Sequence, residues 1–136
     1  RTSKEIEIIQ QYFSAIRSST LAVKDIKDIY HNLVAIGQSG LDNEFGIYRQ
    51  LTDREQKFDR EFHHMLQNER DQEAIDDMAK GIEDEYSDFK QTALNIYHKA
   101  PDFDLASVFN IIREVRDSRK LLVQAFEHYL QAKHLE

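Results

Sequence analysis

Four polar residues stand where long apolar stripes pass through the middle of the helices that the sequence predicts. Ser19, Glu55 and Arg119 each take a stripe position near a helix midpoint, and Glu85 lies close to the midpoint of another helix. In an antiparallel bundle these midpoints share one height, so the side chains would form one polar core layer. A buried charge costs several kcal/mol unless it is paired. We therefore expect Arg119 to pair with Glu55, with Glu85 or with both.

This polar core layer has two interpretations. The one we favour is structural: a buried ion pair that fixes the register of the helices, or an arginine whose long stem carries its charge out to solvent. The functional alternative is a small polar pocket, or a bistable layer whose rearrangement moves one helix relative to the others. A transmembrane signal requires such a movement.

A second polar cluster, Arg17-Ser18-Ser19-Thr20, interrupts the first predicted helix with weak helix formers. An arginine beside small hydroxyl side chains can bind a carboxylate or a similar anion, because the guanidinium offers a planar fork of donors. The same small side chains can also allow a close helix crossing with another subunit, which is the interpretation we favour. The candidate ligand-binding residues are Arg17, Ser18, Thr20 and Arg119, whereas Arg54 is assigned to the solvated surface.

Metal and catalytic chemistry find little support in the sequence. Carboxylate-bridged iron sites in helical bundles need a Glu-x-x-His pattern on two helices, and only Glu61 and His64 match it. The chain has no Cys, no phosphate-binding glycine loop and no serine on a glycine-rich turn. We therefore predict no metal, no cofactor and no catalytic residue, and we expect that the protein is not an enzyme.

The spacing of apolar residues predicts four helices, at about 3–36, 42–67, 71–99 and 104–133. Apolar residues recur mostly at alternating steps of three and four, which keeps one stripe of each helix facing its neighbours. Two consecutive steps of four around Ile82 and Tyr86 interrupt the stripe of the third helix. The stripe positions are Ile9, Tyr12, Ile16, Ser19, Val23, Ile26, Tyr30 and Leu33 in the first helix; Tyr48, Leu51, Glu55, Phe58, Phe62 and Met65 in the second; Ile75, Met78, Ile82, Tyr86, Phe89, Ala93 and Ile96 in the third; and Leu105, Val108, Ile112, Val115, Arg119, Leu122, Phe126 and Tyr129 in the fourth. Pro101 ends the third helix and Asp104 can cap the fourth. Short connections place consecutive helices antiparallel. The predicted fold is all-α, an antiparallel up-down-up-down four-helix bundle over residues 1–134, with both termini at one end.

Composition limits the partners. The chain has 136 residues and a formal net charge of −7, with acidic residues spread throughout. Binding to nucleic acid or to anionic lipid is disfavoured, because both need a cationic patch. No apolar run reaches the roughly 20 residues that a membrane span needs. The start at Arg1 and the final Leu135-Glu136, which resembles a vector scar before an affinity tag, lead us to expect a piece of a longer protein.

The predicted helix lengths and three stretches of the sequence resemble a known family. The stretches are 85–89 (Glu-Tyr-Ser-Asp-Phe), 100–106 (Ala-Pro-Asp-Phe-Asp-Leu-Ala) and 122–126 (Leu-Val-Gln-Ala-Phe). The pattern resembles the extracytoplasmic four-helix-bundle sensor domains of bacterial chemoreceptors and sensor histidine kinases. The resemblance implies that the first and fourth helices continue toward the membrane. It also implies that a ligand binds high on the bundle or at a dimer interface, and that a small helix shift transmits the signal.

The resulting expectation is a periplasmic, ligand-sensing domain of a bacterial inner-membrane receptor. It would bind a small molecule, form a homodimer in the full-length receptor, and meet the membrane only through flanking spans. The alternative is a soluble helical adaptor or scaffold module that binds other helices through an exposed apolar face. Apolar spans encoded on both sides of this segment would favour the sensor, and polar flanks would favour the adaptor.

Overall fold

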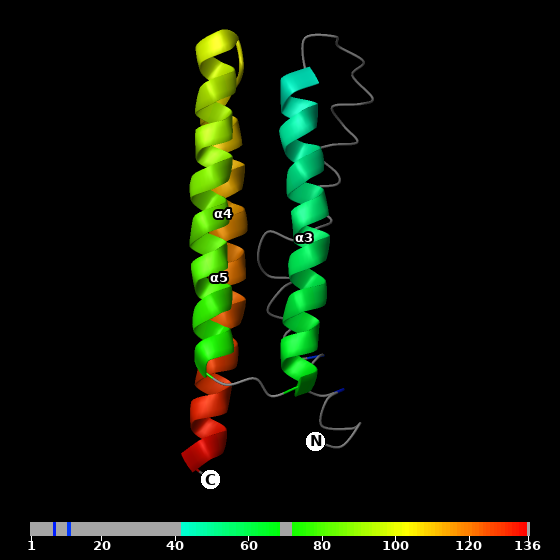
Figure 1. Ribbon diagram of the computed structural model, residues 1–136, viewed down its shortest axis with the longest axis vertical. Coiled ribbons are helices and arrows are strands. Elements are labelled where there is room, and N and C mark those ends of the chain that lie inside the picture. The colour runs from blue at the N-terminus through cyan, green and yellow to red at the C-terminus, as the bar shows by residue number, and fades with distance from the viewer. Residues whose placement is uncertain (1–6, 8–10, 12–41, 69–71, 136) are drawn as a thin grey trace.

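The computed structural model describes Glu7, Gln11, residues 42–68 and residues 72–135. These residues are all-helical, with three long helices and no strand: α3 (Asp42–Asn68), α4 (Gln72–Lys99) and α5 (Leu105–Leu135). The helices lie side by side, and the chain direction alternates from one to the next (Figure 1). The bounds agree closely with the predicted ranges 42–67, 71–99 and 104–133. Apart from Glu7 and Gln11, which are helical, the predicted first helix at 3–36 lies outside the described residues.

The turn between α4 and α5 forms for the reasons that the sequence indicates. The amide of Ala100 donates to the carbonyl of Ile96 at 2.8 Å and closes the last turn of α4, just before Pro101. The amide of Ser107 then donates to Asp104 Oδ1 at 3.2 Å. This bond is the N-cap interaction that satisfies a free amide in the first turn of a helix. The predicted capping role of Asp104 is thus confirmed.

Loss of this cap should weaken the α4–α5 hairpin. We expect Asp104→Ala to lower the free energy of unfolding by about 1 kcal/mol, because the Ser107 amide loses its acceptor. Urea denaturation followed by circular dichroism measures this change. The matched control is Asp102→Ala, an exposed aspartate of the same turn; an equal loss in both variants would contradict the capping role.

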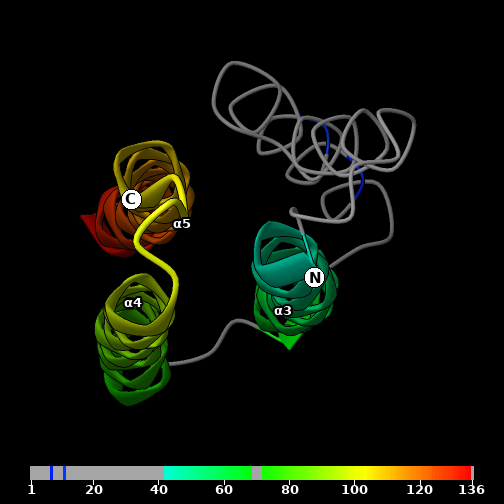
Figure 2. The same ribbon diagram turned by 90° about the horizontal axis from the view of Figure 1, so that it is seen from above.

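The three helices pack around a shared centre. Seen from above, their axes stand at the corners of a triangle (Figure 2). Helices α4 and α5 have the most extensive mutual packing, and α3 contacts both. No helix among the described residues is long and apolar enough to span a membrane.

The core follows the predicted stripes. Every stripe residue predicted on α3 is buried, as are the central six on α5. Those residues are Tyr48, Leu51, Glu55, Phe58, Phe62 and Met65 on α3, and Val108, Ile112, Val115, Arg119, Leu122 and Phe126 on α5. On α4 the buried residues of the predicted stripe are Ile75, Ile82, Phe89 and Ala93. The heptad spacing therefore identified the inward face of each described helix.

Two apolar clusters make up this core. One is centred on Phe62 and Phe126, near the end where α3 leads to α4. The other is centred on Leu51 and Ile112, toward the α4–α5 turn. The buried charges Glu55 and Arg119 stand between the two clusters along their helices. A polar layer thus divides the apolar interior.

Candidate functional site

Arg119 of α5 lies between two carboxylates that come from the other two helices. Its Nε donates to Glu55 Oε1 of α3 at 2.5 Å, and its Nη1 donates to Glu85 Oε2 of α4. Arg119 is 2% exposed and Glu55 is 1% exposed. Three of the four residues predicted for the polar core layer are therefore brought together, with Arg119 bonded to both glutamates. The fourth, Ser19, lies outside the described residues.

The surroundings of Arg119 offset part of the cost of burying it. Burial lowers the pKa of its guanidinium, and the charge and hydrogen bond of Glu85 oppose that change. The guanidinium carbon also stands 5.4 Å from the ring centroid of Phe58, within range of a cation–π contact. Because arginine stays protonated in proteins, the layer holds a permanent positive charge.

Two carboxylates face this one buried cation, and a second cation approaches from the surface. Arg54 Nε of α3 lies 3.5 Å from Glu85 Oε1, and about half of the Arg54 side chain is exposed. The distance is too long for a good hydrogen bond. Arg54, which the sequence assigned to the solvated surface, is therefore an outer member of the layer.

Two buried polar atoms of the layer make no hydrogen bond: Arg119 Nη2 and Glu85 Oε1. Both residues also line a small cavity of about 10 Å³. An unmet buried hydrogen-bonding group costs about 1–3 kcal/mol. The layer therefore has spare hydrogen-bonding capacity on the Glu85 side.

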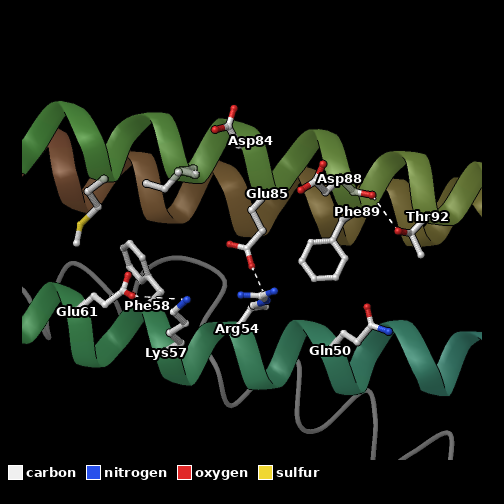
Figure 3. A pocket seen from close by; sticks show the side chains of 13 residues that line it. Gln50, Arg54, Lys57, Phe58, Glu61, Asp84, Glu85, Asp88, Phe89 and Thr92 are labelled. Carbon is white, nitrogen blue, oxygen red and sulfur yellow. Dashed lines mark hydrogen bonds and ion pairs between the residues drawn. The ribbon is translucent and has the colours of Figure 1, made fainter.

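A larger groove opens between α3 and α4, with a volume of about 340 Å³. Its charged lining consists of Arg54, Lys57 and Glu61 from α3 and Asp84, Glu85 and Asp88 from α4 (Figure 3). Its apolar lining consists of Phe58, Met78, Ile82 and Phe89. The groove therefore combines a charged rim with an aromatic and aliphatic wall, as small-molecule sites commonly do.

Glu85 belongs to both the groove and the core layer. One of its carboxylate oxygens accepts from Arg119, and the other faces Arg54 across the groove (Figure 3). Ile82 and Phe89 line both the groove and the small cavity. A molecule bound in the groove would thus lie one side chain away from the charge that joins α3, α4 and α5.

The outer surface of the α4–α5 pair carries further ionic contacts. Glu83 lies 3.0 Å from Lys120 Nζ and 3.6 Å from Arg116 Nη1, and the hydrogen bond from Lys120 holds the pKa of Glu83 below its ordinary value. Arg116 also stands 4.1 Å from the ring centroid of Tyr86. Exposed ion pairs contribute only about 0–1 kcal/mol. These exposed pairs therefore add little to the link between α4 and α5.

Of the four predicted ligand-binding residues, only Arg119 is among the residues that the structure describes. Arg17, Ser18 and Thr20 lie outside the described residues. Arg119 is buried and paired with two carboxylates, so direct contact between a ligand and its guanidinium requires the layer to open. Asp88 belongs to the 85–89 stretch of the sequence but is not among the predicted site residues, although its spacing of three from Glu85 places both on one helix face.

Among the described residues, Glu61 and His64 of the Glu-x-x-His match each have another side-chain neighbour. Glu61 lies 3.9 Å from Lys57, and His64 interacts with the side chain of Asn68 one turn later. The part of the chain that the structure describes has no group of three or more His, Asp or Glu residues placed to hold a metal ion.

No protein family, curated protein or solved structure matches this chain.

Proposed function

We propose that this chain is the extracytoplasmic ligand-sensing domain of a bacterial transmembrane receptor, of the chemoreceptor or sensor histidine kinase type. The observation that carries the proposal is the double role of Glu85, which lines the solvent-open groove and also binds the buried Arg119. In this proposal, residues 3–36 form the first helix of an antiparallel four-helix bundle. The domain has no catalytic activity and converts ligand binding into a helix shift.

A ligand in the groove would act on α5 through Glu85 and Arg119. A ligand shifts a conformational equilibrium only if it binds the two states differently. A ligand that changes the hydrogen bonding of Glu85 changes how Arg119 divides its donors between Glu85 and Glu55. Since Arg119 is on α5, the balance of these bonds sets where α5 sits relative to α3 and α4. Helix shifts of about 1–2 Å are common in such transitions.

The membrane arrangement follows from the same proposal. The first and last helices continue into flanking spans of the inner membrane, and the domain itself lies in the periplasm. In the full-length receptor it pairs as a homodimer, as its resemblance to bundle sensors suggests. The sequence encoded on either side of this segment provides a simple check: apolar spans support a receptor, whereas polar flanks support the soluble adaptor or scaffold alternative.

The direct experiment has two stages. A thermal-shift screen against amines, amino acids, organic acids and inorganic anions first identifies compounds that stabilise the domain. The domain is then placed between the spans of a receptor with a kinase output, and the kinase activity is measured with each stabilising compound. We expect at least one compound to stabilise the domain and also to change the output. Compounds that bind but leave the output unchanged would contradict a sensor role.

A further inference from the structure

We infer that the α3–α4 groove is a binding site for a small organic cation, namely a protonated primary amine that carries a short apolar group. This inference names the ligand class for the sensor and therefore rests on the proposed function. It draws on the charge of the groove, on one carboxylate oxygen without a hydrogen bond, and on the apolar wall.

The charge of the groove favours a cation. Its lining contains four carboxylates and two basic side chains. Lys57 lies 3.9 Å from Glu61, and Asp84 accepts a hydrogen bond from Lys80 at 2.9 Å. Among the described residues, the carboxylate of Asp88 has neither a hydrogen bond nor an ion pair. An anionic ligand would add to this surplus of negative charge, whereas a cation would offset it.

Glu85 supplies the acceptor that fits an ammonium group. Its Oε1 atom is buried and accepts no hydrogen bond, and Arg54 Nε stands 3.5 Å from it. An ammonium group has three donors and is compact. Glu85 and Asp88 are three residues apart, so their side chains share a face of α4. An ammonium beside Asp88 would neutralise it and, once Arg54 moves away from the buried Glu85 Oε1, would donate to that oxygen.

The apolar lining determines what the rest of the ligand must be. Phe58 comes from α3, and Met78, Ile82 and Phe89 come from α4. Aromatic faces attract cations and also pack against aliphatic chains. A bare metal ion would leave this wall without a partner. A volume of about 340 Å³ is at the small end of ligand pockets, so the apolar group must be short.

Isothermal titration calorimetry with n-butylamine, which is protonated at pH 7, tests the inference directly. Three related probes separate its parts: n-butanol lacks the charge, butanoate reverses it, and tetramethylammonium keeps it but lacks N–H donors. A hydrogen bond to a charged group changes affinity by about tenfold or more. We therefore expect n-butylammonium to bind at least about tenfold more tightly than each of the other three. Equal binding of n-butanol or tetramethylammonium would overturn the inference.

Two aspartate variants place the binding in the groove. Asp88→Asn should weaken n-butylammonium binding about tenfold, because the unpaired charge is lost. The matched control is Asp77→Asn, which changes an exposed aspartate of the same helix outside the groove lining and should bind as the wild type does. Both positions are exposed, so both variants should fold. Equal affinity in Asp88→Asn and wild type would rule out this site.

The outcomes distinguish this inference from the proposed function. A receptor output that responds to an anion, with no binding of n-butylammonium, would remove the cation site and leave the sensor role standing. Binding of n-butylammonium that depends on Asp88 but never changes the receptor output would keep the site and remove the sensor role.

Discussion

Arg119→Met is expected to lower the free energy of unfolding by about 3–5 kcal/mol, one of the two largest effects that we predict. The substitution keeps much of the length of the side chain but removes the buried cation that pairs with Glu55 and Glu85, and Glu55 is only 1% exposed. Removing one member of a buried ion pair leaves an uncompensated charge in the interior, and losses of about this size result. Urea denaturation followed by circular dichroism provides the measurement.

Two further variants show whether the loss comes from removing the buried cation. Arg113→Met removes an exposed arginine of the same helix and should change the stability by no more than about 0.5 kcal/mol. The triple variant Arg119→Met, Glu55→Leu, Glu85→Leu removes the three charges that are joined by hydrogen bonds in the layer. It should recover most of the stability, because apolar replacement of a complete buried ion network is often neutral or stabilising. If Arg119→Met costs no more than Arg113→Met, the layer is not a buried ionic unit.

The second large effect is expected at Phe126, where alanine should cost about 3–5 kcal/mol. Phe126 is 0% exposed. Its ring meets the Phe62 ring edge to face and stacks on Tyr129, each at a centroid distance of 6.3 Å. The substitution would leave a cavity at the centre of one apolar cluster, and tightly packed neighbours can close it only in part.

The matched control for Phe126→Ala is Leu121→Ala on the same helix. Leu121 is 44% exposed, so its replacement should cost far less. Urea denaturation of both variants gives the comparison. Similar losses at the two positions would mean that α5 presents a different face to the core.

Much of the described fold could be predicted because each helix carries one strong apolar period. Stripe residues such as Leu51 and Phe58 specify both a helix and its inward face, and Pro101 with Asp104 specifies the turn between two helices. The pairing of Arg119 with Glu55 and Glu85 could be predicted for a simple reason. Antiparallel helices of similar length bring their midpoints to one height, and a buried cation needs an anion at that height.

The groove could not be predicted in the same way. Arg54, Lys57 and Asp88 lie beside the apolar stripes rather than on them, and in the sequence they look like ordinary solvated charges. Whether such residues face a neighbouring helix depends on the rotation and spacing of both helices, which the apolar period fixes only loosely. The special position of Glu85 could be predicted in part, because Glu85 lies beside the two consecutive four-residue steps of the apolar stripe around Ile82 and Tyr86. A shift of the stripe at that point places Glu85 between the core and the groove.

The relay from the groove to α5 can be measured most directly as a distance between α4 and α5, because no residue of α5 lines the groove. The chain has no cysteine, so Ser87→Cys on α4 and Gln124→Cys on α5, both at exposed positions, accept a unique pair of spin labels. Pulsed electron–electron double resonance then gives the distance with and without saturating n-butylammonium, or another groove ligand from the screen. We predict a shift of about 1–2 Å, and Asp88→Asn should need about tenfold more ligand to show it. An unchanged distance in a protein shown by calorimetry to be saturated would contradict the relay.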